Sequence, residues 1–284
     1  MFQQQRARWR QIVAVMVLGL LAVACVAPAA APVATQAPMP AVVVEASDTA
    51  LTVPADVPAG LVAVTVNNSG QAPHAPFFAR LNDGVTEEKF MEALAADESG
   101  MAAIALVALL GGAQVEPGAR QQMTFDFKPG NYIALDFGEG PPQIASFTTT
   151  AGDGPVPAEP AATVNADLID FQFVLPDQIK AGAQTWKIEN KGSQWHEMGI
   201  FKLNEGATVE DVMAMMMSEE EPAGPPPFEE MAFWAPMSEG ERAWLTVDLP
   251  AGTYTVMCFL PDFASDPPTS HLEHGMVRTL TVTE

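Results

Sequence analysis

The sequence predicts an all-β protein built from two tandem Greek-key β-sandwiches, each interrupted by a short helical insertion. Three observations carry this prediction: a residue pattern that recurs at a fixed offset, short segments of alternating apolar and polar residues, and turn-forming Gly, Pro and Asn between them. The chain has 284 residues, of which 48% are hydrophobic and 17% are charged. This composition supports folded cores and excludes a disordered polyelectrolyte.

The recurring pattern has an offset of 122 residues and runs without a gap for about ninety residues. So many identities at one offset indicate two homologous units. We place these units at residues 45–150 and 163–284, joined by a Gly/Ala/Pro-rich linker at 151–162. The identities include Asp48 and Asp170, Asn68 and Asn190, Gly70 and Gly192, His74 and His196, Tyr132 and Tyr254, and Phe137 and Phe259.

Several segments have the patterns of strands. Residues 184–188 (QTWKI) and 243–249 (AWLTVDL) alternate bulky apolar with polar residues, as half-buried strands do. Residues 254–259 are more continuously apolar, which is typical of a strand buried on both faces. Short strands separated by turns favour an antiparallel sandwich in each unit.

Each unit also predicts one helix. Thr208 is suited to be the N-cap of the segment TVEDVMAMMM, with Asp211 at the spacing of a capping box. The counterpart starts at Thr86 (TEEKFMEALAA) and is followed by the apolar run 102–110. In the second unit the Pro-rich segment 222–227 must end the helix, because proline cannot continue it.

The N-terminus has the features of a secretory signal peptide, predicted to span residues 1–24. Arg6, Arg8 and Arg10 precede an apolar run at 12–24 that is too short to cross a bilayer comfortably. The Ala/Pro-rich residues 25–44 predict a tether behind it.

The apolar run ends in Leu-Ala-Val-Ala-Cys25, which resembles the lipobox of bacterial lipoproteins. The resemblance implies that Cys25 becomes the lipidated first residue and anchors an extracytoplasmic protein to the outer face of the cell membrane. An ordinary signal peptide cleaved nearby is the alternative.

Charge and motifs exclude several classes of function. The chain has 13 basic and 35 acidic residues, a net charge of -22, so a nucleic-acid partner is excluded for want of clustered Lys and Arg. No Ser-His-Asp set, phosphate loop or distinct carboxylate pair stands out. These classes of catalytic and nucleotide-binding site are therefore not predicted.

The two units differ near their C-terminal ends. The offset rises from 122 to 133, so the second unit carries 11 extra residues before its last strand. This segment contains His271, His274 and Met276, and the strand before it carries Cys258, whose counterpart in the first unit is Asp136. The second unit alone therefore holds a thiol, imidazoles and a thioether in one local stretch.

This pattern resembles the cupredoxins, the blue-copper proteins, whose ligands are one His on an early strand and a Cys, a His and a Met near the C-terminus. The resemblance implies a cupredoxin-like sandwich for both units and a copper site in the second unit only. The motifs that carry it are Asn190-x-Gly192-x-x-x-His196, Gly252-x-Tyr254-x-x-x-Cys258 and His271-x-x-x-Gly275-Met276.

The resemblance further implies one copper ion with His196, Cys258 and His271 as equatorial ligands and Met276 as axial ligand. Thiolate and thioether are soft ligands that suit Cu(I), whereas imidazole suits both oxidation states of copper. The implied function is a single-electron carrier with a redox partner protein, and not an enzyme. The first unit is then a degenerate copy with a structural or docking role.

Some alternatives stay open at this point. Twelve residues separate Cys258 from His271, against only a few in simple blue-copper proteins, so His274 is an alternative ligand. A metal-free binding or scaffold lipoprotein and a non-redox copper carrier are the alternative functions. The methionines at 213 and 215–217 are interpreted as core or interface filling.

Overall fold

The computed structural model describes residues 37–97, 100–138, 142–152, 154–218 and 224–284. The predicted signal peptide, Cys25, most of the tether and residues 222–223 of the Pro-rich segment lie outside the described residues. Within the described ranges, no helix is long and apolar enough to cross a membrane.

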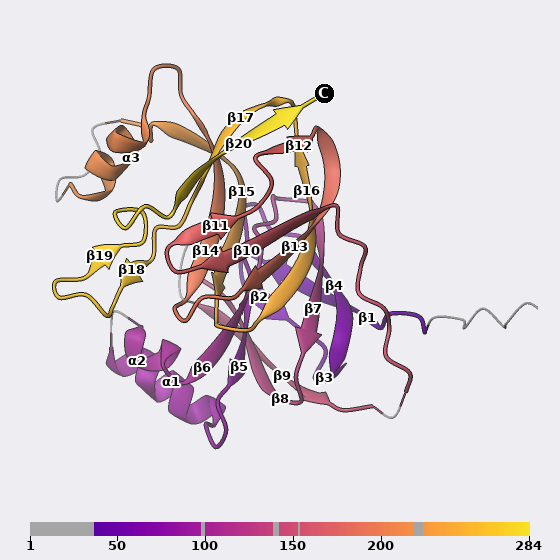
Figure 1. The fold of residues 1–284 in the computed structure, drawn as a ribbon. Helices are drawn as coiled ribbons and strands as arrows, with labels where there is room; N and C mark the ends of the chain where they lie inside the picture. The colour runs from indigo at the N-terminus through magenta and orange to yellow at the C-terminus, as the bar shows by residue number, and fades with distance from the viewer. Residues whose placement is uncertain (1–36, 98–99, 139–141, 153, 219–223) are drawn as a thin grey trace, which may run out of the picture. The chain divides into compact units, whose positions relative to one another are not determined.

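The described residues are mostly strands, and the prediction of an all-β fold is confirmed (Figure 1). The first unit contains β1 (Ala41–Ser47), β2 (Ala50–Thr52), β3 (Asp56–Pro58), β4 (Gly60–Asn68), β5 (Phe77–Leu81), α1 (Glu87–Ala96), α2 (Met101–Ile104), β6 (Val107–Gly111), β7 (Arg120–Phe127), β8 (Gly130–Asp136) and β9 (Gln143–Thr150). The second unit contains β10 (Val164–Ile169), β11 (Gln172–Val174), β12 (Gln178–Lys180), β13 (Gly182–Asn190), β14 (His196–Leu203), α3 (Val209–Met216), β15 (Phe228–Met237), β16 (Arg242–Leu249), β17 (Gly252–Met257), β18 (Pro261–Asp262), β19 (Thr269–Ser270) and β20 (Val277–Thr283).

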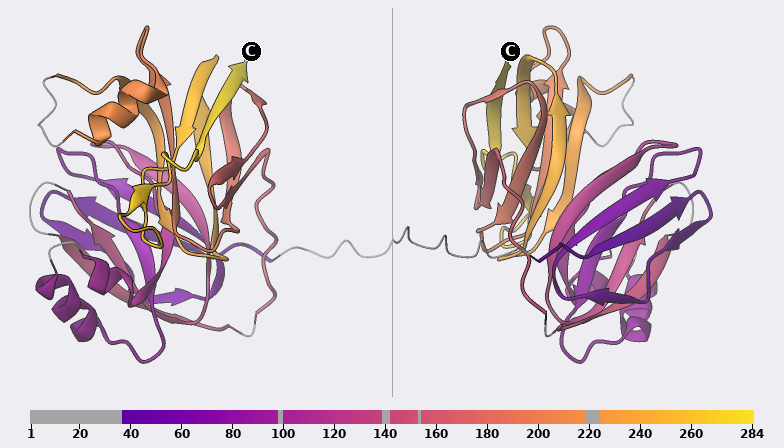
Figure 2. Two further views of the ribbon diagram at one scale, coloured as in Figure 1. Left: turned by 60° about the vertical axis from the view of Figure 1, so that its left-hand side comes forward. Right: turned by 90° about the vertical axis from the view of Figure 1, so that its right-hand side faces the viewer.

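Equivalent strands of the two units occur in mirrored order in two large sheets, which Figure 2 shows from two further directions. The eight-stranded sheet has the order β11-β10-β13-β16-β7-β4-β1-β2, and the ten-stranded sheet has the order β12-β20-β17-β14-β15-β6-β5-β8-β9-β3. Both sheets continue across the boundary between the units, with Trp244 opposite Thr124 in one and Met237 opposite Leu110 in the other. Each unit contributes four strands to the eight-stranded sheet and five strands to the ten-stranded sheet, so each unit forms a two-layered β-sandwich.

The prediction of an antiparallel sandwich in each unit needs one correction, because both sheets also contain parallel strand pairs. β1 runs parallel to β4, and β10 runs parallel to β13. The short strands β3 and β12 also pair in parallel, with β9 and β20. The cause is a crossover: after β1 the chain passes through β2 and β3, on different sheets, before β4 returns beside β1.

The helical predictions hold in the second unit and need one change in the first. Thr208 caps α3, and its side chain and that of Asp211 form the predicted capping box. Thr86 likewise caps α1. The apolar run 102–110 divides into the single turn α2 and the strand β6. β1 begins at Ala41, so the last four residues of the predicted tether belong to the sheet.

A glycine and an indole pack together where the two units meet. Gly111 at the end of β6 has a positive φ of 86°, and a Cβ there would lie 2.2 Å from Nε1 of Trp234 in β15. The indole ring centroid of Trp234 also lies 5.8 Å from the ring of Phe125. Only glycine can therefore stand at position 111 while this tryptophan covers the boundary.

Candidate metal centre

Three potential ligands from different parts of the second unit converge in its interior. His196 is the first residue of β14, Cys258 follows the last residue of β17, and His271 follows β19. β14 and β17 are hydrogen-bonded neighbours, which brings the first two residues to the same end of the sheet. One donor atom of each of the three residues lies within 4.8 Å of the others, and all three side chains are buried.

The hydrogen bonds of the imidazoles point their Nδ1 atoms towards each other. Nε2 of His196 lies 2.7 Å from Oδ1 of Asp170, and Nε2 of His271 lies 3.3 Å from Oε1 of Gln194. Both partner atoms are acceptors, so each Nε2 carries the proton and each Nδ1 presents a lone pair.

The two Nδ1 atoms are 3.1 Å apart, and Sγ of Cys258 lies 3.4 Å from Nδ1 of His271. Two lone pairs at this distance repel each other unless a cation or a proton lies between them. Imidazole nitrogens and a thiol are ligands that copper accepts, so the residues present fit a single copper ion.

The local electrostatics keep the imidazoles neutral. Burial, followed by the neighbouring His196, lowers the pKa of His271 to about 4. Burial also lowers the pKa of His196, against the opposing effect of its hydrogen bond to Asp170. Burial alone would raise the pKa of Asp170, but hydrogen bonds from Ser193 and His196 outweigh it and hold this pKa at about 2. Neutral imidazoles are the form that binds a metal.

The thiol has the opposite shift. Burial raises the pKa of Cys258 to about 12, and the charge of Glu197 acts in the same direction. Burial raises the pKa of Glu197 itself to about 7, although its carboxylate accepts a hydrogen bond from the backbone N–H of Phe259. Cys258 is therefore protonated at neutral pH until a metal displaces its proton.

The Asn-x-Gly motif before His196 builds the support of this histidine. The Asn190 side chain donates to the carbonyl oxygens of Gln194 and Met237, and its own carbonyl accepts from the N–H of Gly192. A Cβ at Gly192 would lie 2.3 Å from Oδ1 of Asp170 and 2.7 Å from Nε2 of His196. Glycine is needed here because the carboxylate and the imidazole meet directly above it.

Backbone hydrogen bonds close the long segment between Cys258 and His271. β18 and β19 pair as a small hairpin, and the N–H of His271 donates to the carbonyl of Leu260. Met276 is fully buried; its N–H donates to the carbonyl of His271, and its carbonyl accepts from the N–H of Cys258. The twelve intervening residues thus bulge outward while their ends return to the site.

His274, the alternative ligand, lies outside the group of converging donors. Its Nε2 is 2.9 Å from Oγ1 of Thr269 and 3.2 Å from a carboxylate oxygen of Asp262. Its ring stacks on Phe171 at a centroid distance of 4.4 Å. These contacts fasten the hairpin instead of directing the imidazole inward.

Asp170, Gln194 and Glu197 are site residues that the sequence did not single out for chemistry. Asp170 carries a signal that could have revealed it, because it recurs at the offset of 122 together with the histidine it contacts. Gln194 and Glu197 have no such signal, since their counterparts are Ala72 and Ala75.

The first unit has a closed arrangement at the corresponding place. Nδ1 of His74 lies 2.5 Å from Oδ2 of Asp136, and its Nε2 lies 3.4 Å from Asp48. Both ring nitrogens therefore face a carboxylate, and neither is directed at a second imidazole or a thiol.

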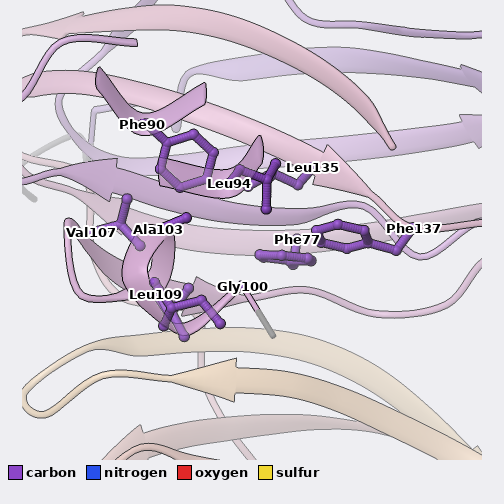
Figure 3. A pocket seen from close by; sticks show the side chains of 10 residues that line it. Phe77, Phe90, Leu94, Gly100, Ala103, Val107, Leu109, Leu135 and Phe137 are labelled. Atoms are coloured by element: carbon purple, nitrogen blue, oxygen red, sulfur yellow. The ribbon is translucent and has the colours of Figure 1, made fainter. Parts of the chain in front are cut away.

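A separate pocket of about 280 Å³ lies in the first unit beneath α1 and α2 (Figure 3). Apolar side chains such as Phe77, Phe90 and Leu135 line it, together with Gly100. It contains no titratable or metal-binding side chain among its lining residues, so we place no chemistry there.

Comparisons with known proteins give structural matches only. Neither a protein-family model nor a curated protein matches the chain. Reduced auracyanin from Roseiflexus castenholzii is 19% identical with a TM-score of 0.30, and the match covers 42% of this chain and 95% of that chain. Auracyanin A, described as a "blue" copper protein from Chloroflexus aurantiacus, is also 19% identical with a TM-score of 0.30, covering 42% of this chain and 96% of that one. The copper nitrite reductase from Nitrosomonas europaea is 14% identical with a TM-score of 0.25, covering 87% of this chain and 95% of that one.

Proposed function

We propose that the protein is an extracytoplasmic type 1 copper electron carrier, anchored to the membrane through Cys25 and without enzymatic activity. The observation that carries the proposal is the convergence of two Nδ1 lone pairs and one thiol in a buried place. His196, Cys258, His271 and Met276 would hold the ion. Bound copper would supply a one-electron couple between Cu(I) and Cu(II).

The chain's own residues prepare this site for electron transfer. Asp170 accepts the hydrogen bond of Nε2 of His196, and Gln194 accepts that of Nε2 of His271. These two bonds keep both imidazoles in one tautomer and one orientation. The ring centroid of Phe171 lies 4.8 Å from that of His271, and the His271 side chain is only 1% exposed, so little water reaches the site. A preorganised, buried ligand set needs little rearrangement when the charge of the ion changes.

The absorption spectrum of the full chain after addition of Cu(II) tests this proposal. We expect an intense blue thiolate-to-copper band that is lost in Cys258→Ala. Cys25→Ala is the matched control, because the chain has only two cysteines, and it should keep the band. A colourless protein that binds no copper would favour the metal-free scaffold, and colourless copper binding would favour the non-redox carrier.

The anchoring part of the proposal has its own test. The protein produced with its N-terminus intact should sediment with membranes and gain the mass of a lipid group. Cys25→Ala should release it into the soluble extracytoplasmic fraction. Membrane association that survives this substitution would remove Cys25 from the proposal.

A further inference from the structure

Three methionines of α3 lie beside the loop that carries His271. Met213 and Met216 belong to the helix, and Met217 caps it in helical conformation. The spacing i, i+3, i+4 places the three side chains on one side of the helix. They line a pocket of about 90 Å³, whose residues are Met213, Met216, Met217, Ser270, Leu272 and Glu273.

The two outer methionines are not part of the core. Met217 is 66% exposed and Met216 is 46% exposed, whereas Val212 on the same helix is completely buried. Val212 and the half-buried Met213 supply the packing of α3 against Phe201. Core filling therefore does not apply to Met216 and Met217, whose side chains are exposed at the surface, whereas interface filling stays a prediction.

The chemistry of the pocket selects a soft monovalent cation. Thioether sulfur is a soft, neutral ligand that suits Cu(I) and has little affinity for hard cations. Glu273 adds one negative charge, and its carboxylate accepts hydrogen bonds from the N–H and the hydroxyl of Ser270, at 2.7 and 2.9 Å. One carboxylate among three thioethers can balance the charge of Cu(I) without forming an oxygen-rich site.

The pocket is fixed to the candidate metal centre by the chain itself. Leu272 lines the pocket and is the residue directly after His271. Its side chain is 3% exposed and belongs to the same apolar cluster as Val212 of α3. The helix and the ligand loop are therefore packed together, with the methionines on the outside and His271 on the inside.

We propose that Met213, Met216 and Met217 form a surface site that receives Cu(I) and passes it to the buried centre. Binding at the surface is independent of the function proposed above, whereas the transfer step rests on it. Transfer is a ligand exchange without a change in oxidation state. Thioether–copper bonds break, bonds to imidazole and thiolate form, and the thiol proton of Cys258 goes to water.

Competition with a chromophoric Cu(I) chelator, without oxygen, tests the surface site in the full chain. Cys258→Ala is the parent, so that the buried thiolate does not contribute. We expect the triple variant M213L/M216L/M217L in this background to bind Cu(I) at least about tenfold more weakly than the parent, because leucine keeps the apolar volume but lacks the sulfur. Unchanged unfolding midpoints would show that both proteins are folded.

Met215→Leu is the matched control, because this residue lies on the same helix but does not line the pocket. It should bind Cu(I) like the parent. Equal Cu(I) affinity of the triple variant and the parent would overturn the proposal, as would an equal loss in Met215→Leu, which would show a general effect of the helix.

The transfer step is tested with Cys258 intact. When copper is supplied as Cu(I) and the protein is oxidised afterwards, the triple methionine variant should take up copper slowly. When copper is supplied as Cu(II), the variant should take it up at the normal rate. Equal loading rates from Cu(I) would overturn the transfer. A protein that binds Cu(I) through the methionines but never turns blue would contradict the electron carrier and leave the surface site standing.

Discussion

The two units place the same histidine in the same frame and then use it differently. His74 and His196 each follow an Asn-x-Gly motif, and each directs Nε2 at an aspartate, Asp48 or Asp170. The difference lies on the neighbouring strand. In the first unit Asp136 occupies the position of Cys258 and lies 2.5 Å from Nδ1 of His74.

This comparison shows what makes a buried histidine available to a ligand. The carboxylate of Asp136 satisfies Nδ1 of His74 within the chain, so that unit is complete as it folds. Among the residues that the structure describes, the hydrogen-bonding partner of Nδ1 of His196 is Nδ1 of His271, and the nearby thiol is a weak hydrogen-bonding group. One substitution and an added loop thus turn a closed structural pair into an open set of donors.

Exchanging the residue on the neighbouring strand should have the largest effect. We expect Cys258→Asp to abolish the blue band and the binding of copper, because the new carboxylate can pair with an imidazole as Asp136 does. Metal analysis and the absorption spectrum measure this. Retention of one tightly bound copper would show that the thiol is not a ligand.

Disrupting the buried pair of His74 and Asp136 should strongly destabilise the first unit without changing copper binding. His74 and Asp136 are 3% and 1% exposed, and removal of one partner from such a buried pair typically costs about 3–5 kcal/mol. We expect a loss of this size in the free energy of unfolding of Asp136→Ala, measured with urea on the full chain.

The control for this prediction is Asp48→Ala. The Asp48 side chain is 45% exposed and its oxygen lies 3.4 Å from His74, so its loss should be smaller. Equal free energies of unfolding of the two variants would show that the buried pair of His74 and Asp136 does not stabilise the first unit more than Asp48 does.

Weakening the support of His196 should reduce copper affinity but not abolish it. Asp170→Asn keeps an oxygen acceptor for Nε2 and removes the charge. Loss of such a supporting partner typically costs about 10–100-fold in metal affinity, which is the expected effect here. The corresponding Asp48→Asn should leave copper affinity unchanged. An equal change in copper affinity in both variants would show that Asp170 does not act by supporting His196.

The pH dependence of copper binding should report the thiol proton. The pKa of Cys258 is raised by burial to about 12, and that of His271 is lowered to about 4. From neutral pH, where both imidazoles are neutral, up to about pH 12 copper displaces one proton, so its affinity should rise about tenfold for each unit of pH. Below pH 4 the slope should steepen, because His271 must also lose a proton. Chelator competition at several pH values measures this slope.

Glu197→Gln is the control for the pH series. Burial raises the pKa of the Glu197 carboxyl to about 7, which lies inside the window to be measured. The slope of the variant should stay near one proton. An affinity independent of pH would mean that the ion is bound without displacing the thiol proton.

Local patterns in the sequence were sufficient for many elements of the fold. The capping box of Thr208 and Asp211 and the strand alternation at 243–249 depend on neighbouring residues, and these features can be recognised without coordinates. The position of Gln194 and the parallel pairing of β1 with β4 could not be predicted, because both depend on contacts between segments distant in the chain.

The sequence by itself determined that the protein has two homologous units and that only the second carries Cys258 and the added histidine segment. Identities at one offset and the types of side chain are properties of the linear chain. Tertiary structure decided that His196 and His271 face each other, that His274 turns to Asp262, and that both sheets continue across the two units. The physical reason is that hydrogen-bond partners and strand neighbours fix a side chain's direction, and these partners come from residues that the chain brings together only when it folds.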